Sequence, residues 1–152
     1  MHTVRMAQQH DLDRLVAMRL LLWPESSHEE ESQQVRTLLS TGMSGTLPAA
    51  ILVAQDGYDA LIGFLEVGLR SHADGCDTAH AVGFVEGWFV DPAHRGRGVG
   101  GALMRAAEDW ARSRGCTEIA SDALIGNQAS HRVHELLGFE LVDRCVHFRK
   151  PL

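Results

Sequence analysis

The sequence is poor in long hydrophobic runs, in cysteine and in positive charge. No apolar stretch approaches the roughly 18 residues of a membrane-spanning helix, so no membrane partner is expected. Cys76, Cys116 and Cys145 are odd in number and lack CxxC spacing, which argues against a disulfide framework and a zinc site. Acidic residues outnumber basic ones by 20 to 14, for a formal charge of -6, which argues against a nucleic-acid partner. A cationic small molecule fits this charge better, although the same charge also keeps a soluble protein dispersed.

Targeting and metal-binding signals are missing too. The N-terminus has no basic region followed by an apolar stretch and a small-residue cleavage site, which predicts a cytoplasmic location. Nine histidines are present, but none lies in HExxH, so no metal is expected. With 152 residues, 45% of them hydrophobic, the chain can close one core, and a single domain over 1–152 is expected.

Hydrophobic periodicity and turn residues predict an α+β domain. The expected helices are 12–22, 27–39 with a capping box at its start, 99–114 and 127–137. The expected strands are 2–6, 49–54, 61–67, 81–90, 117–121 (buried) and 142–148. Residues 42–45 are expected to form a loop, and Asp56-Gly57 an antiparallel hairpin turn.

A glycine-rich segment, Arg95-Gly96-Arg97-Gly98-Val99-Gly100-Gly101, lies between a strand and an amphipathic helix. Glycine allows a tight turn, and the free amides at a helix start attract phosphate oxygens, so the segment is a candidate pyrophosphate site. The alternative is a turn without a ligand. A Walker loop is absent, and a dinucleotide fingerprint is disfavoured because the segment follows a β meander rather than opening a βαβ unit.

Two motifs in this context resemble the GNAT N-acetyltransferase superfamily. They are Val90-Asp91-Pro92 followed by Arg95-x-x-Gly98-x-Gly100, and Asn127 opening a helix that ends in Leu137-Gly138-Phe139. The resemblance implies a GNAT-type mixed, splayed central β-sheet flanked by helices, with acetyl-CoA as cosubstrate. It also implies pyrophosphate binding by the loop amides and pairing of the preceding strand with the pantetheine arm, at a bulge that Gly87 permits. Asn127 would lie near the thiol, serve as an ordinary N-cap, or do both. The residues so assigned to the cofactor are Trp88, Phe89, Val90, Arg95, Gly96, Arg97, Gly98, Val99, Gly100, Gly101 and Asn127.

Three further segments resemble the aminoglycoside 6'-N-acetyltransferases, which act in antibiotic resistance. They are Leu20-Leu21-Leu22-Trp23-Pro24, Val85-Glu86-Gly87-Trp88-Phe89-Val90 and Ala120-Ser121-Asp122. The resemblance implies a cationic aminoglycoside held by Trp23, Glu86 and Asp122, with Asp143 contributed across a homodimer interface. The terminal strand is then a candidate for exchange between subunits. Plainer roles remain open for Trp23 as a core-edge residue and for Asp143 as a solvated charge.

The expected chemistry is direct attack of an amine on the thioester. Carboxylates have ordinary pKa values far below those of amines, so Asp122 and Glu86 should mainly bind and orient ammonium groups. If one carboxylate is the catalytic base, Asp122 is the first candidate and Glu86 the second. The amide of Phe89 or Val90 is a candidate oxyanion donor. His134 stands where many family members have a tyrosine that acts as general acid for the leaving thiolate, and it would either protonate the thiolate or have a structural role. Acetylation of another amine (a polyamine, an amino acid or a protein N-terminus) and non-catalytic binding of acyl-CoA or drug remain alternatives.

Overall fold

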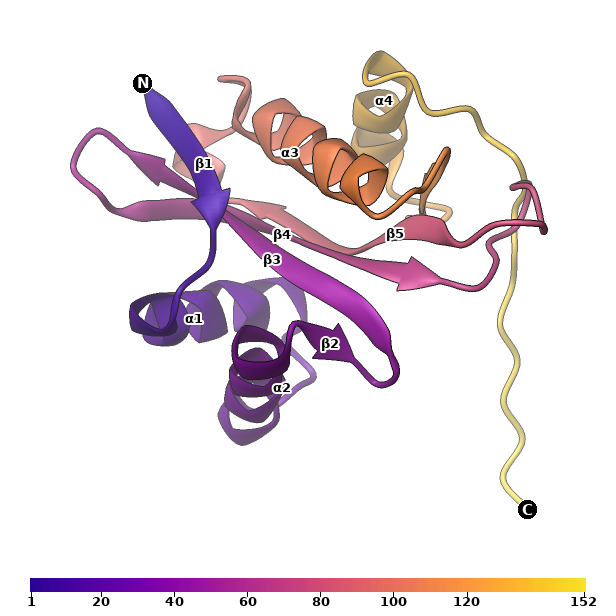
Figure 1. Ribbon diagram of the computed structural model, residues 1–152, viewed down its shortest axis with the longest axis horizontal. Coiled ribbons are helices and arrows are strands. Elements are labelled where there is room, and N and C mark those ends of the chain that lie inside the picture. The colour runs from indigo at the N-terminus through magenta and orange to yellow at the C-terminus, as the bar shows by residue number, and fades with distance from the viewer.

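A six-stranded sheet runs through the centre of the computed structural model, which describes residues 1–152 (Figure 1). The strands are β1 (His2–Met6), β2 (Met43–Ser44), β3 (Leu47–Asp56), β4 (Leu61–Arg70), β5 (Val82–Val90) and β6 (Ile119–Ser121). The helices are α1 (Leu12–Leu22), α2 (His28–Thr41), α3 (Val99–Ser113) and α4 (Gln128–Leu136), with single 3-10 turns η1 (Gln9–Asp11) and η2 (Pro92–His94). No helix is both long enough and apolar enough to span a membrane.

The sheet has the order β1-β3-β4-β5-β6, with β2 paired to β3 beside this path. All neighbours are antiparallel except β5 and β6, which are parallel. Helices α1 and α2 cover one face and α3 covers the other (Figure 1). This mixed sheet between helices confirms the predicted fold class.

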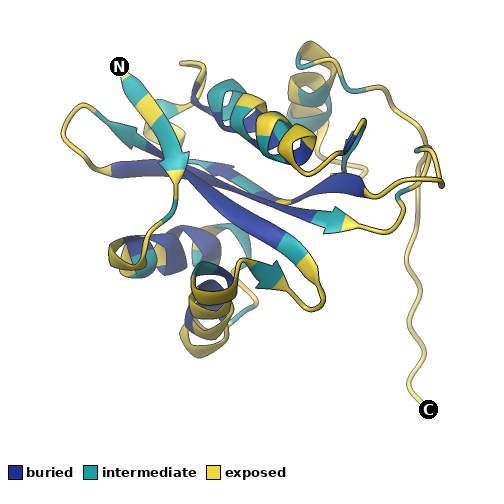
Figure 2. Cartoon of the chain, in the orientation of Figure 1, coloured by how far each residue is buried: buried dark blue, intermediate teal, exposed yellow.

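The central strands are buried over most of their length (Figure 2), and alternation of their side chains produces two cores, one on each face of the sheet. On β3, Ile51 and Val53 pack with α1 and α2, while Ala50 and Leu52 pack with α3. Because both faces are covered, these strands are continuously buried rather than alternately buried and exposed.

The sheet opens where β5 passes a β-bulge. Glu66 pairs with Gly87 and Val67 pairs with Val85, so Glu86 is an extra residue on β5. Strand β6 pairs only with residues 83–85, and the remainder of β5 therefore has a free edge on that side. The bulge expected beside Gly87 is confirmed.

Helix boundaries follow the predicted capping residues closely. The Ser27 hydroxyl accepts the Glu30 amide at 3.1 Å, and Gly42 ends α2 with a φ of 65°. The second half of the expected capping box does not form, because the Glu30 carboxylate accepts from the Ser26 hydroxyl. Residues 43–44 of the expected loop form β2, and β6 is shorter and less buried than predicted.

The expected terminal strand over 142–148 is wrong. The chain after α4 passes the β4–β5 loop and then extends away from the sheet without pairing (Figure 1). Phe148 is 93% exposed, and Val142 lies against Gly75 in the β4–β5 loop. A strand needs a neighbouring edge to pair its backbone groups, and the segment meets no such edge within one chain.

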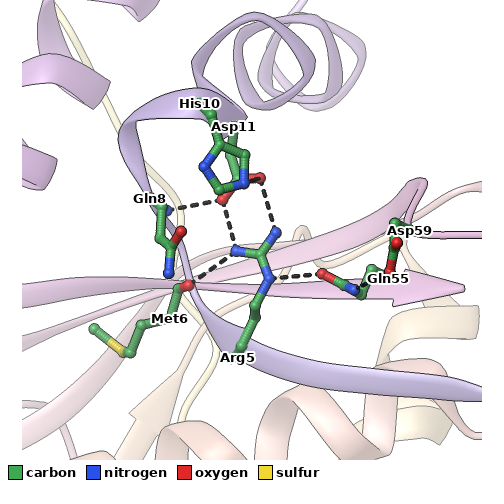
Figure 3. A network of polar contacts seen from close by, with 7 residues as sticks. All are labelled: Arg5, Met6, Gln8, His10, Asp11, Gln55 and Asp59. Carbon is green, nitrogen blue, oxygen red and sulfur yellow. Dashed lines mark hydrogen bonds and ion pairs between the residues drawn. The ribbon is translucent and has the colours of Figure 1, made fainter.

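An ion pair between a partly exposed arginine and a buried aspartate attaches β1 to the start of α1 (Figure 3). The Arg5 guanidinium donates to both Asp11 carboxylate oxygens at 2.7 and 2.9 Å and to the Gln55 side chain at 2.6 Å. The Gln8 amide donates to the same carboxylate at 2.8 Å. The Asp11 side chain is only 3% exposed, and the Arg5 guanidinium lowers its pKa.

Candidate active site

The free edge of β5 presents the backbone groups of Trp88 and Val90. The Asp91 amide donates to the Ile62 carbonyl on β4 at 2.8 Å. Because amide directions alternate along a strand, the Phe89 amide points toward β4 and the amides of Trp88 and Val90 point away from it. Of the two amides considered as oxyanion donors, the geometry therefore favours that of Val90. The Val90 carbonyl accepts from Arg95 Nε at 2.8 Å.

The glycine segment forms a turn directly before α3. Gly96 and Gly98 have φ values of 73° and 82°, a region that L side chains rarely adopt. Gly98 is the N-cap of α3, and no side chain caps this end. The amides of the first turn, which includes Gly100 and Gly101, are therefore free to bind an anion.

Side chains on either side of these glycines have different surroundings. Val99 is buried in the core, which anchors the start of α3. Arg95 and Arg97 are exposed, and together they add positive charge beside the amides.

The Trp88 side chain lies between α3 and α4. Its Nε1 is buried without a hydrogen-bond partner, and a Cβ on Gly100 would lie 3.5 Å from this nitrogen. The indole meets the His134 ring edge to face, with centroids 5.4 Å apart. A buried indole N–H normally has a partner, so this one is an unused donor at the glycine segment.

His134 uses both ring nitrogens within the protein. Nδ1 lies 2.7 Å from the Ser130 carbonyl and Nε2 lies 2.8 Å from the Ser121 hydroxyl. Since a carbonyl only accepts, Nδ1 carries the proton in the neutral ring and Nε2 accepts from Ser121. This arrangement leaves no free proton on neutral His134 for a leaving thiolate.

Asn127 is the N-cap of α4. Its side-chain oxygen accepts the Ser130 amide at 3.2 Å, and the residue is exposed. The capping role predicted for Asn127 is confirmed, while its contact with a cofactor stays a prediction.

Trp23 lies against the bulge. A Cβ on Gly87 would come within 2.5 Å of the indole, so only glycine accommodates this contact. The ring also meets Phe64 edge to face at 6.3 Å, and the Arg19 guanidinium lies 4.7 Å from its centroid. Trp23 is half-buried and thus combines the core-edge position with a partly open face.

A buried polar network contacts Trp23 through the Arg19 guanidinium. Arg19 binds the carboxylates of Glu31 and Glu66 and donates to Gln34 at 2.8 Å, which joins α1, α2 and β4. Burial raises the pKa of Glu66 despite the neighbouring guanidinium. This network was not predicted from the sequence, although Glu66 inside an apolar strand was a signal, since buried charges need partners.

Glu86 points to the same face of the sheet as Trp23. Gly83 faces Ala111 of α3, so by alternation Phe84 and Glu86 face the side of α1 and α2. Glu86 is not a free carboxylate, because Arg70 donates to its two oxygens at 2.9 Å each. This pair was not anticipated, because Arg70 lies beyond the strand expected over 61–67.

Asp122 lies beside the bulge, whereas Asp143 does not. Asp122 directly follows Ser121, whose register partner on β5 is Val85, and its side chain is exposed. Asp143 accepts the Arg144 amide in the unpaired C-terminal segment. A single chain therefore brings together three of the four predicted acceptor residues.

The combined geometry suits an elongated ligand with an anionic end and a reactive end. Free amides and arginines lie at the start of α3, an unpaired strand edge leads away from them, and carboxylates with an indole stand at the bulge. The chain contains no group of three or more potential metal ligands.

Comparisons with known proteins identify the family of this chain. The acetyltransferase (GNAT) family model matches residues 15–139. An aminoglycoside N(6')-acetyltransferase type 1 of Klebsiella aerogenes is 41% identical over 149 residues, covering 98% of this chain and 96% of the relative. A protein of the same name from Stenotrophomonas maltophilia is 38% identical, covering 99% of this chain and 94% of the relative.

Two solved structures share the whole fold. AAC(6')-Iy in complex with the bisubstrate analog CoA-S-monomethyl-acetylneamine has a TM-score of 0.89 and 31% identity, covering 100% of this chain and 99% of the other. The aminoglycoside 6'-N-acetyltransferase AAC(6')-Ih from Acinetobacter baumannii has a TM-score of 0.86 and 32% identity, with the same coverage. The chain described here therefore belongs to the GNAT acetyltransferase family.

Proposed function

We propose that this chain is an aminoglycoside 6'-N-acetyltransferase that acetylates an amino group of the antibiotic from acetyl-CoA and thereby confers resistance. The observation that carries the proposal is the approach of Trp23, Glu86 and Asp122 to the bulge at which the free edge of β5 begins. The relatives and solved structures bearing this activity support it over nearly the full chain.

The donor side is assigned to the glycine segment and the free edge. Amides of residues 96–101, with Arg95 and Arg97, would bind the pyrophosphate, and the backbone of Trp88 and Val90 would pair with the pantetheine arm. These residues fit the cofactor because the first turn of α3 is uncapped and the Trp88 indole has an unused donor. Acetyl-CoA supplies an activated acetyl group as a thioester.

The acceptor side is assigned to Trp23, Glu86 and Asp122. The amine lone pair attacks the thioester carbon, the C–N bond forms, and the C–S bond breaks, so that coenzyme A leaves as a thiolate and takes a proton from solvent. The Val90 amide would stabilise the oxyanion of the tetrahedral intermediate. Asp122 would hold and orient the amine, whose proton leaves through water because the ordinary pKa of a carboxylate is far below that of an alkylamine.

The direct test is an acceptor panel. The purified chain is mixed with acetyl-CoA and with kanamycin, tobramycin or spermidine, and thiol release is followed. Release with the aminoglycosides, with the product acetylated at the 6'-amine by NMR, supports the proposal. Release with spermidine alone indicates another amine acetyltransferase, and binding without turnover indicates a non-catalytic binding protein.

Asp122→Asn should lower kcat/KM for kanamycin by about 10- to 100-fold, mainly through KM, because a charge-assisted contact to the ammonium is lost. Steady-state kinetics check this, with KM for acetyl-CoA expected to remain unchanged. Asp109→Asn removes an equally negative charge from the surface of α3, where Asp109 pairs with Arg112, and should leave both constants intact. Equal effects of the two substitutions would show that only the general charge matters.

We also propose a homodimer in the cytoplasm. The C-terminal segment carries exposed apolar side chains, including Val146 and Phe148, with no strand beside them. Pairing with an edge of a second copy would satisfy the backbone and cover these side chains, and it would bring the partner's Asp143 near the acceptor site. All three cysteines are unpaired, which suits a reducing compartment.

A further inference from the structure

Arg70 forms an ion pair with Glu86, one of the carboxylates assigned to binding the acceptor. Its guanidinium donates to both Glu86 oxygens at 2.9 Å and lies 3.5 Å from the centroid of the Phe84 ring. We propose that Arg70 competes with the ammonium groups of the acceptor for Glu86 and so is a specificity-determining residue that limits affinity for polycationic acceptors. This inference rests on the proposed function, because it takes Glu86 as part of the acceptor site.

The geometry of the pair follows from strand register. Arg70 ends β4 opposite Val82, and residues opposite each other in an antiparallel pair point to the same face. Phe84 and Glu86 follow Val82 at intervals of two on that face. Arg70 therefore lies along Phe84 and reaches Glu86 at the bulge, in the fork geometry that suits a carboxylate.

The Arg70–Glu86 ion pair is partly exposed, so a cationic acceptor can replace Arg70 at the carboxylate. The Arg70 and Glu86 side chains are 45% and 35% exposed, and ion pairs at such positions are weak. Arg19, in contrast, binds its carboxylates at 2% exposure. A polycation arriving at Glu86 can thus displace Arg70, but it must do so against a guanidinium of the same charge sign.

Asp122 differs from Glu86 in this respect. It is exposed and takes part in none of the ion pairs of the structure. The two carboxylates beside the bulge therefore attract ammonium groups unequally, because Asp122 has no ion-pair partner and Glu86 is paired with Arg70. Arg70 could instead position Glu86 for the acceptor, and the two roles predict opposite effects of its removal.

Arg70→Gln removes the guanidinium while keeping a polar, uncharged side chain that is shorter than arginine. With kanamycin as the varied substrate and saturating acetyl-CoA, we expect KM for kanamycin to fall about fivefold, the change expected when one like charge near the site is removed. The KM for acetyl-CoA should stay unchanged. Arg70→Lys, which keeps the charge but loses the two-pronged contact, should give an intermediate value.

A double-mutant cycle with Glu86→Gln separates competition from positioning. If Arg70 competes, Glu86→Gln raises KM for kanamycin little in the wild-type background and severalfold in the Arg70→Gln background. Arg112→Gln removes the same charge from the surface pair with Asp109 and should leave KM unchanged. Circular dichroism and Tm report whether each variant is folded, and Arg70→Lys replaces Arg70→Gln in the cycle if the latter does not fold.

The two proposals fail in different ways. A higher or unchanged KM for kanamycin in a folded Arg70 variant, with an active wild-type enzyme, overturns the competition and leaves the proposed function standing. Absence of aminoglycoside acetylation by the wild-type enzyme overturns the proposed function itself.

Discussion

The ionised form of Asp11 depends strongly on Arg5, although Asp11 lies in a short turn near the surface. Its side chain is almost fully buried, and Arg5 together with the Gln8 amide lowers its pKa (Figure 3). A carboxyl whose pKa is lower in the folded than in the unfolded chain stabilises the fold while it is ionised. This contribution is complete above the unfolded pKa of about 4 and is lost as the pH falls through the lower folded pKa.

Asp11→Asn should therefore reduce the free energy of unfolding by about 2 kcal/mol at pH 7, because the Arg5 guanidinium loses its carboxylate. The difference from wild type should shrink as the pH is lowered below about 4. Urea unfolding at pH 7 and pH 3 measures both effects. Asp13→Asn is the control, since Asp13 is exposed two residues away. Similar losses of unfolding free energy in Asp11→Asn and Asp13→Asn would contradict a specific role of the Arg5–Asp11 ion pair.

Residue types at the site were predictable, but their partners were not. Motif spacing pointed to Trp23, Glu86 and Asp122, and the structure places all three at the bulge. Spacing along one segment cannot say that Arg70, 16 positions from Glu86, reaches it across a strand pair. Register and the bulge decide that contact, and both depend on tertiary pairing.

Helix α3 has a left-handed glycine at each end, and the two glycines have different roles. Gly98 precedes α3 with φ 82°, Gly115 follows it with φ 85°, and a Cβ added at either glycine would have no atom within 4 Å. An alanine at either position is strained by its backbone conformation alone. Only Gly98 borders the proposed pyrophosphate site.

Gly98→Ala and Gly115→Ala should each cost about 1 kcal/mol of stability. Gly98→Ala should in addition weaken binding of coenzyme A about tenfold, because rearrangement at the N-cap misaligns the amides of the first turn. Calorimetry for binding and thermal unfolding for stability check this. Equal coenzyme A affinity in the two variants would remove the phosphate role from this end of α3.

Elements with a strong internal pattern were predicted better than elements that depend on a partner. The capped helices and the β3–β4 hairpin lie where turn residues and periodicity placed them. The predicted strand over 142–148 has the apolar content of a strand but no edge to join in one chain. Propensity alone does not decide β structure, because pairing and burial provide most of its stability.

At its C-terminal side the molecule leaves α4 and the segment after it largely exposed to solvent. No residue of α4 is buried, and Leu136 is 85% exposed. The unpaired segment that follows is exposed over most of its length (Figure 2) and adds further exposed apolar residues, among them Val146 and Phe148. Exposed apolar side chains of this kind support the homodimer proposed above, in which a second copy would cover them.

Phe148→Asp should shift the proposed dimer toward monomer, because a charge would enter the proposed interface at a cost of several kcal/mol. Sedimentation velocity over a concentration series measures the shift. Tyr58→Asp is a matched control, since Tyr58 is also 93% exposed but lies in the β3–β4 turn. A wild-type protein that is monomeric at high concentration would contradict the dimer.

The open edge of β5 arises because β5 has one residue more than β4 at the bulge, and it does not depend on which amino acid that residue is. One residue more on β5 than on β4 shifts the pairing at Glu86, and β6 stops pairing at the same place. Substitution at position 86 changes a side chain and leaves this count intact. Loss of the single codon for residue 86 would restore even pairing between β4 and β5 and would remove the bulge at which the free edge begins. In genetic terms, we expect point mutations to alter side chains of the acceptor site without closing the edge, whereas an in-frame deletion of one codon would remove the open edge itself.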